Sequence, residues 1–114
     1  MNNNKLIVIR KVKEFCLDID KLVINFPKKE FVIKDKILVD SLSILEDVIY
    51  INYVKVRSNV VEYKFKLLTK ISMLDFYFEY LFKKNIINQK VFNKLGKELN
   101  DISRLIYGWL KDEC

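Results

Sequence analysis

The chain has 114 residues, of which 51% are apolar and 32% charged, and its formal net charge is +6. This composition excludes a disordered chain, and no apolar run approaches the ~18 residues that a bilayer-spanning helix needs. The apolar stretch near the N-terminus, "LIVI", is followed at once by "RKVK" and lacks the cleavage site of a signal peptide. We therefore expect one domain, residues 1–114, that stays in the cytoplasm and binds no membrane.

Glycine and proline are nearly absent, with two copies and one copy, so the turn chemistry that β-hairpins require is missing. Apolar residues recur instead at steps of three and four, which predicts an all-helical chain. The first predicted helix is about twenty residues long and ends before Pro27, because proline disfavours helical backbone in the residue that precedes it. Its core stripe comprises Val8, Val12, Phe15, Ile19, Leu22 and Phe26.

The second predicted helix begins near Phe31 and extends to about Arg57, where the polar segment at residues 57–59 predicts a turn. The apolar spacing again follows one side of a helix, here of about 28 residues. Its expected core stripe comprises Phe31, Lys34, Ile37, Leu38, Leu42, Leu45, Ile49 and Tyr53, flanked by Val48 and Asn52.

The third predicted helix, residues 60–84, is apolar on more than one side. One stripe comprises Val60, Leu67, Ile71, Leu74, Phe78 and Leu81. A second set points elsewhere and comprises Phe65, Leu68, Phe76, Tyr80 and Phe82. One bundle core cannot cover both sets, so we expect the second set to contact another subunit of a homo-oligomer.

The fourth predicted helix begins after Asn88, a favourable N-cap, with Ile87 and Phe92 at the two positions of a hydrophobic staple. Its core stripe comprises Phe92, Leu95, Leu99, Ile102, Ile106 and Trp109. Trp109 is the last member of this stripe, and Gly108 beside it leaves room for a neighbouring helix. The plainest interpretation is a tryptophan that closes the open end of a bundle.

These patterns predict an all-α fold in which four helices of roughly 20, 28, 25 and 22 residues alternate in direction. Short connections favour antiparallel neighbours, so the expected architecture is an up-down-up-down four-helix bundle that assembles into a cyclic homo-oligomer. A fold of this kind names no function by itself.

Residues that carry chemistry are scarce. The sequence contains no histidine, so it offers neither a Ser-His or Cys-His dyad nor the Glu-x-x-His pairs of a bundle metal site. It also lacks a glycine-rich phosphate loop. Asp75 and Glu79 lie one turn apart, which usually marks a solvated face, and we interpret Cys16 as a core residue and Cys114 as a free terminal thiol. We therefore expect no enzyme activity, no catalytic residue, no metal and no cofactor.

Basic residues are concentrated in three segments. Residues 1–13 hold Lys5, Arg10, Lys11 and Lys13, and residues 83–97 hold Lys83, Lys84, Lys90, Lys94 and Lys97. Residues 55–70 hold Lys55, Arg57, Lys64, Lys66 and Lys70 against Glu62 alone. Any one cluster is usually a solubilising face, but three on a small domain favour a polyanionic partner, for which nucleic acid is the natural candidate. The five basic residues of segment 55–70 are the candidate nucleic-acid site.

The sequence also resembles a known family. The relevant segments are "NFPKKEFVIKDKILVDSLSILEDVIYINY" at 25–53 and "LFKKNIINQKVFNKLGKELNDISRLIYGWLKDEC" at 81–114, with the Phe-Pro-Lys entry and the terminal Gly-Trp-Leu. They resemble the four-helix bundle proteins that are accessory variability determinants of diversity-generating retroelements. A sister group, encoded within ribosomal RNA intervening sequences, carries an Asn-Ile-Ala-Glu-Gly motif where this chain reads "EDVIYINY". The comparison favours the retroelement branch.

The resemblance implies a non-catalytic accessory subunit that forms a homopentamer and binds the element's reverse transcriptase and template RNA during mutagenic cDNA synthesis. The lysine clusters, repeated around such a ring, would give a strong positive field. Two features depart from the family: "VIKD" at 32–35 replaces a Leu-Gly pair, and the start of the third helix is less rich in arginine. An RNA-associated bundle of the intervening-sequence type and a plain oligomerisation module remain as alternatives.

Overall fold

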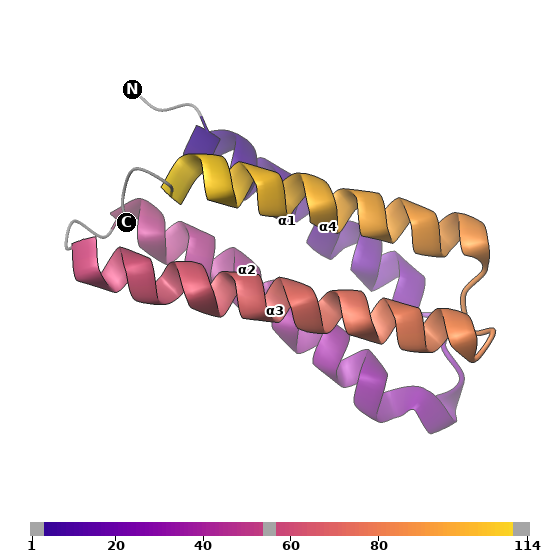
Figure 1. Ribbon diagram of the computed structural model, residues 1–114. Coiled ribbons are helices and arrows are strands. Elements are labelled where there is room, and N and C mark those ends of the chain that lie inside the picture. Colours follow the sequence, from indigo (N-terminus) through magenta and orange to yellow (C-terminus); the bar gives the residue numbers. More distant parts are fainter. Residues whose placement is uncertain (1–3, 54–56, 111–114) are drawn as a thin grey trace.

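The computed structural model describes residues 4–53 and 57–110, with side chains from residue 7 to 53 and from 60 to 110. Over these residues the chain is all-helical and has no strand, which confirms the predicted fold class (Figure 1). The helices are α1 (Asn4–Val23), α2 (Phe31–Tyr53), α3 (Arg57–Lys83) and α4 (Gln89–Leu110). A short 3-10 helix, η1 (Lys28–Glu30), precedes α2.

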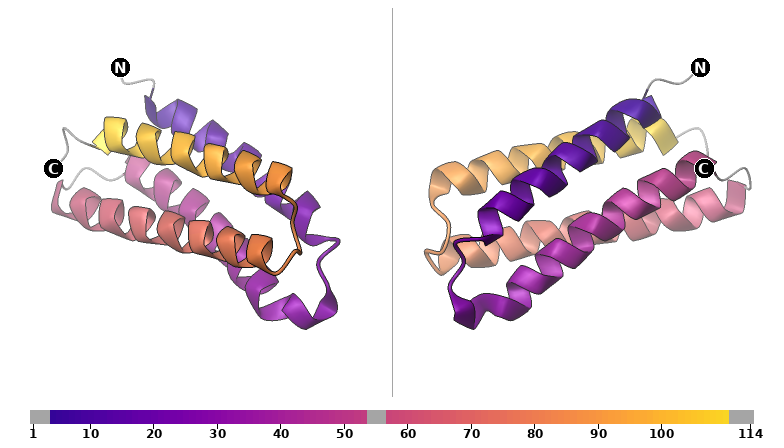
Figure 2. Two further views of the ribbon diagram at one scale, coloured as in Figure 1. Left: turned by 45° about the vertical axis from the view of Figure 1, so that its right-hand side comes forward. Right: turned by 180° about the vertical axis from the view of Figure 1, so that it is seen from behind.

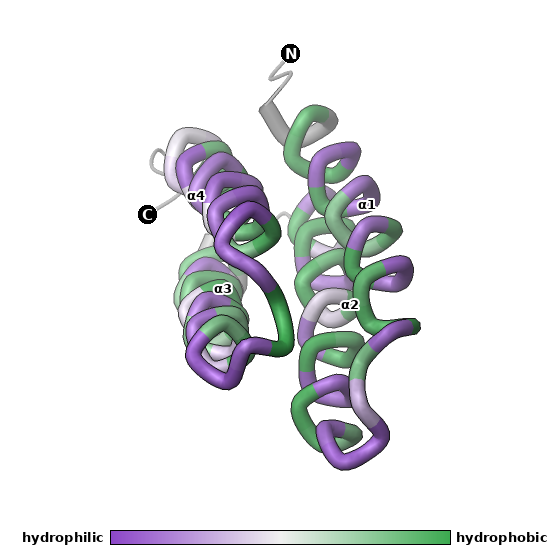
Figure 3. The backbone as a smooth tube through the Cα atoms, turned by 90° about the vertical axis from the view of Figure 1, so that its right-hand side faces the viewer, coloured by the Kyte–Doolittle hydropathy of each residue, from purple (hydrophilic) through white to green (hydrophobic). Residues whose placement is uncertain are grey.

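The four helices alternate in direction and form a bundle of about 43 × 23 × 19 Å (Figure 2). Helix α1 packs against α2 and α4, and α3 packs against the same two helices. Seen from the end of the bundle, α2 and α4 therefore occupy opposite corners (Figure 3). The outward sides of these two helices consequently face in opposite directions.

The core stripes predicted for α1, α3 and α4 are confirmed. In α1 and α4 every predicted member is buried or half-buried, and Trp109 keeps only 5% of its surface exposed. The predicted stripe of α3 is buried as well, together with Tyr77. Phe65 and Phe76, from the second apolar set of α3, are exposed. These three helices have polar residues on at least one side, so the apolar pattern identifies the side that faces the core.

The core stripe predicted for α2 is correct only in part: Ile37 is buried and Leu38, Leu45 and Ile49 are half-buried, but the stripe as a whole is turned away from the core. Phe31, Leu42 and Tyr53 are exposed, and Lys34 is only half-buried. The buried residues are Ile37, Ser41, Ile44, Asp47, Val48 and Ile51. Helix α2 is apolar on both sides, and its packed side includes two polar residues, so hydropathy alone favours the wrong side.

The polar residues on the packed side of α2 are satisfied by hydrogen bonds. The Ser41 hydroxyl donates to the carbonyl of Ile37 at 2.7 Å, and the Cys16 thiol donates to the carbonyl of Ser41 at 3.3 Å. Because the Ser41 side chain is small and its hydroxyl and carbonyl are hydrogen-bonded, α1 and α2 can pack closely at this point without burying an unpaired polar group.

The predicted turn at residues 57–59 is also wrong, because these residues are helical and begin α3, whereas α2 ends at Tyr53.

The boundary of α4 is confirmed: the Asn88 side-chain oxygen accepts the N–H of Val91 at 2.9 Å, as an N-cap requires. Helix α3 ends in a Schellman motif, in which Asn85 has a positive φ of 59° and the N–H of Ile86 donates to Leu81.

The two turns at this end of the bundle are joined by an ion pair. The side chain of Glu30 is only 5% exposed and accepts a hydrogen bond from the Lys84 ammonium at 2.8 Å. This hydrogen bond and a second one to Tyr80 raise the pKa of Lys84. Lys84, which belongs to the basic segment 83–97, therefore serves as the counter-ion of a buried carboxylate.

Candidate interaction surfaces

The five basic residues predicted as a nucleic-acid site do not form one described face. Lys55 lies outside the described residues, and Arg57 lies in α3 with its side chain outside the described part. At about 100° per residue, Lys64 lies about 160° from Lys66 and about 120° from Lys70 around the helix. Its ammonium lies 5.3 Å from the centre of the Tyr107 ring in α4, whereas Lys66 pairs with Glu62 at 3.3 Å.

Lys70 is part of the packing between α2 and α3. Its ammonium contacts the Asp47 carboxylate at 2.5 Å and the Ser43 hydroxyl at 2.7 Å. The Asp47 side chain is 9% exposed and the Lys70 side chain 27%. The geometry therefore gives Lys70 a structural partner inside the bundle, and a role in nucleic-acid binding stays a prediction.

Replacing Lys70 by methionine is expected to lower the free energy of unfolding by about 2–3 kcal/mol, because the Asp47 carboxylate would stay buried without its cation. Urea unfolding measures this change. The matched control is Lys66→Met, which removes an exposed pair with Glu62 and should leave stability nearly unchanged. Adding Asp47→Leu to Lys70→Met should restore most of the loss, and equal effects of the two lysine variants would contradict the structural role.

A basic stripe runs along the outward side of α4. Lys90, Lys97 and Arg104 are exposed and follow each other at seven-residue steps, so they lie on one side of the helix over about 21 Å. The exposed residues Asn93 and Asn100 lie between them. None of the three cations has an ion-pair partner within residues 7–53 and 60–110. We call these three residues the α4 stripe.

The α4 stripe was only partly foreseen from the sequence. The basic segment 83–97 includes Lys90 and Lys97, but Arg104 lies beyond it. The signal that would have found all three is the seven-residue spacing, which keeps residues on one side of a helix.

The outward side of α2 has the opposite character. Its exposed apolar residues are Phe31, Val32, Val39, Leu42, Tyr50 and Tyr53. Because a helix turns by about 100° per residue, Asp35 and Glu46 lie on the same side as these apolar residues, and both are exposed. Because α2 and α4 are diagonal in the bundle, an apolar and acidic face lies opposite a basic and polar face (Figure 3).

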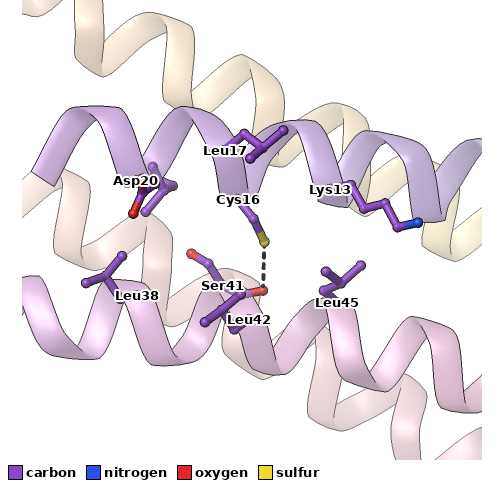
Figure 4. A pocket seen from close by; sticks show the side chains of 9 residues that line it. Lys13, Cys16, Leu17, Asp20, Leu38, Ser41, Leu42 and Leu45 are labelled. Carbon is purple, nitrogen blue, oxygen red and sulfur yellow. Dashed lines mark hydrogen bonds between the residues drawn. The ribbon is translucent and has the colours of Figure 1, made fainter.

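A pocket of about 410 Å³ lies between α1 and α2, next to the apolar face of α2 (Figure 4). Cys16 and Ser41 form its floor, and the hydrogen bond between them joins the two helices. The other lining residues are Lys13, Leu17, Ile19, Asp20, Leu38, Leu42 and Leu45. Burial raises the pKa of the Cys16 thiol, so this group stays protonated at neutral pH.

A second, more polar hollow between α1 and α4 is lined by several carboxylates, including Asp18, Glu98 and Asp101. Burial, followed by the charge of Asp18, raises the pKa of Glu98. Within the described part of the chain, no group of three or more carboxylate or thiol side chains is arranged to hold a metal ion. No described helix has the length and apolar character needed to cross a bilayer.

No protein-family model matches the chain, and no curated protein matches it significantly. A solved structure does match: a protein of unknown function from the S23 ribosomal protein family of Bacteroides thetaiotaomicron. It superposes with a TM-score of 0.85 over 95% of this chain and 98% of that chain, at 21% sequence identity. At this identity the likeness shows the fold, a four-helix bundle that is similar over nearly its whole length.

Proposed function

We propose that this chain is a non-catalytic accessory subunit that holds nucleic acid on the α4 side of the bundle and a protein partner on another side. The observation that carries the proposal is the segregation of surface character between the diagonal helices α2 and α4. Three cations on one side of α4 have no ion-pair partner among the described residues. They suit a phosphate backbone, whose spacing is regular and whose contacts carry little base information. The apolar face of α2 suits a protein.

The specific setting that we propose is a diversity-generating retroelement, in which the subunit binds the cytoplasmic reverse transcriptase and its template RNA. The sequence resemblance over residues 25–53 and 81–114 supports this setting. An alternative is an RNA-associated bundle without a polymerase partner, which the S23 ribosomal protein family of the similar structure favours. A plain helical oligomerisation module is the third candidate.

The proposed assembly is a homo-oligomer, most simply a cyclic pentamer, that uses the outward side of α3. Phe65, Met73 and Phe76 are exposed on this side, where no described residue of the same chain covers them. A ring would also place several copies of the α4 stripe on one particle, so that weak phosphate contacts add up to useful affinity.

Light scattering tests the assembly: the particle should have several times the mass of the 13.7 kDa chain. Phe65→Glu with Phe76→Glu should reduce that mass, because two carboxylates would be buried in the contact. A wild-type monomer at micromolar concentration would contradict the ring and its multivalency.

Co-expression with the reverse transcriptase of the same element separates the three functions. Co-purification of the enzyme together with RNA binding supports the retroelement role. RNA binding without the enzyme supports the intervening-sequence type, and neither interaction supports the oligomerisation module.

A further inference from the structure

We propose that a hollow between α3 and α4 receives one unpaired base of the nucleic-acid strand whose backbone lies on the α4 stripe, and that it favours bases with an exocyclic amino group. This inference rests on the proposed binding of nucleic acid by the α4 stripe and deepens it. It names the form of nucleic acid, a single strand, and the class of base that suits this side of the bundle.

The hollow has a volume of about 210 Å³ and lies on the seam between α3 and α4, which run side by side (Figure 1). On one side of it the seam is closed by Phe82 and Phe92, whose rings stack with centres 4.7 Å apart. On the other side the Lys64 ammonium lies 5.3 Å from the centre of the Tyr107 ring. Pockets that hold a whole small molecule usually measure roughly 300–1,000 Å³, so this hollow suits one ring system of a larger ligand.

Gly96 keeps the hollow open. It lies in the middle of α4, where glycine lowers helix stability relative to alanine. A Cβ atom at this position would meet no atom of the described residues within 4 Å outside the backbone of its own helix, so no close packing requires the glycine. The space that a side chain would fill is therefore available to a ligand.

The lining combines a buried apolar base with a polar rim. Ile71 and Leu99 are buried, whereas the polar lining residues are exposed or half-buried. These polar residues are Ser72, Asp75, Asn100 and Ser103, and their side chains make no hydrogen bond or ion pair with another described residue. A nucleobase fits this arrangement, because its ring faces are apolar and its edge carries hydrogen-bonding groups.

Asn100 joins the hollow to the α4 stripe. Residues three and four positions apart are neighbours on a helix surface. Asn100 therefore borders Gly96 and Ser103, which line the hollow. It also borders Lys97 and Arg104, two members of the α4 stripe. A strand whose phosphates contact these two cations passes the mouth of the hollow, and one of its bases can turn inward.

The charges around the hollow match a nucleotide. The charged residues that line it, or that lie three or four positions from a lining residue on the same helix, are Asp75, Glu79, Lys97 and Arg104. Glu79 pairs with Lys83 at 2.9 Å, which leaves one carboxylate beside two cations. A nucleotide presents an anionic phosphate to the cations and N–H donors to the carboxylate. A basic protein side chain would instead meet the two cations, and an acidic one would meet Asp75.

Asp75 gives the hollow a preference among bases. An ionised carboxylate accepts hydrogen bonds and cannot donate them, and carboxylates recognise cytosine through its exocyclic amino group. Uracil has the same ring size but carries a carbonyl oxygen in place of that amino group, so it would bring an acceptor against the carboxylate. In a duplex the same edge is already paired and the base is stacked, so the ligand is a single strand.

Fluorescence anisotropy with two labelled single-stranded RNAs tests the proposal on the full chain. Both RNAs have about 12 nucleotides, within the usual site size of a single-strand binder. One contains only cytosine and the other only uracil. The wild-type protein should bind the cytosine RNA at least about fivefold more tightly, and equal affinities would overturn the proposal.

Two substitutions in the hollow locate this preference. Gly96→Leu fills the hollow and should weaken the cytosine RNA at least about fivefold, to the level of the uracil RNA. Circular dichroism and urea unfolding should show a fold at least as stable as the wild type, since leucine is the better helix former. Unchanged affinity for the cytosine RNA in this variant would contradict the site.

Asp75→Asn should bring the two affinities within about twofold of each other, because an amide can also donate to the uracil carbonyl. The matched control is Glu79→Gln, which changes the net charge by the same amount outside the hollow and should keep the preference for cytosine. An equal effect of the two substitutions on this preference would show that net charge causes it, and would contradict the role of Asp75.

Reversal of the α4 stripe separates this inference from the proposed function. If that reversal weakens both RNAs but the wild type does not distinguish them, the proposed function stands and the hollow is no base site. If the wild type binds neither RNA, both proposals fail. If Gly96→Leu leaves RNA binding unchanged but alters the particle mass or the co-purification of a protein, the hollow is a protein contact and the inference is wrong.

Discussion

Reversing the α4 stripe, with Lys90, Lys97 and Arg104 all changed to glutamate, is expected to lower RNA affinity by at least about a hundredfold. Each cation that neutralises a phosphate releases counterions, so three lost contacts in every subunit weaken binding strongly. The slope of log affinity against log salt should become shallower by about 2 for each subunit that contacts RNA. Anisotropy titrations of a labelled single-stranded RNA at several salt concentrations measure both quantities.

The matched comparison is the basic segment 55–70. Reversal of Lys55, Arg57 and Lys64 tests the site predicted from the sequence. Lys66, which is exposed, can be added to this set. Lys70 is left unchanged in this comparison, because its reversal would place a second carboxylate beside the buried Asp47. The helical circular-dichroism signal and the particle mass should persist in both sets, since exposed charges contribute little to stability.

The outcomes of this comparison assign the surface. If segment 55–70 proves essential and the α4 stripe does not, nucleic acid binds where the sequence alone placed it. If neither reversal matters and a reverse transcriptase still co-purifies, the basic charge is a solvated face and the subunit acts through protein contacts.

The fold was predictable from the sequence wherever a helix has one apolar side. Helix α4 is the clearest example, because every core position from Leu95 to Trp109 recurs at steps of three and four with polar residues opposite. Helix α2 has two apolar sides, and the neighbouring helices pack on the side that holds Ser41 and Asp47. Hydropathy gives no means to choose that side, because it does not show that Ser41 is satisfied by the carbonyl of Ile37 within the helix and Asp47 by Lys70, 23 residues away.

The candidate surfaces were less predictable than the fold, for a related reason. Counting lysines locates charge along the chain but does not reveal which cations have partners. Lys70 and Lys84 pair with carboxylates 23 and 54 residues away, which only the packed bundle brings close. The pocket between α1 and α2 likewise depends on how closely the two helices pack at Ser41. No sequence pattern within either helix indicates that a pocket forms there.

Replacing Trp109 by alanine is expected to lower the free energy of unfolding by about 3–5 kcal/mol, the usual range for a buried aromatic residue. Trp109 lies near the end of α4 yet is only 5% exposed, and its neighbour Leu110 is fully buried. The last turn of α4 is therefore held by core packing, which offsets the low helix propensity of Gly108. Urea unfolding at one fixed protein concentration measures the loss, because an oligomer's stability depends on concentration.

The matched control for this last prediction is Tyr107→Ala, two residues away on the exposed side of the same turn. It should cost less than about 1 kcal/mol, since little apolar area leaves the core. Trp109→Phe should fall between the two, because a smaller ring leaves part of the space unfilled. If Tyr107→Ala proves as damaging as Trp109→Ala, the end of α4 is held by its outer surface, through contacts such as that between Tyr107 and Lys64 or through a neighbouring subunit.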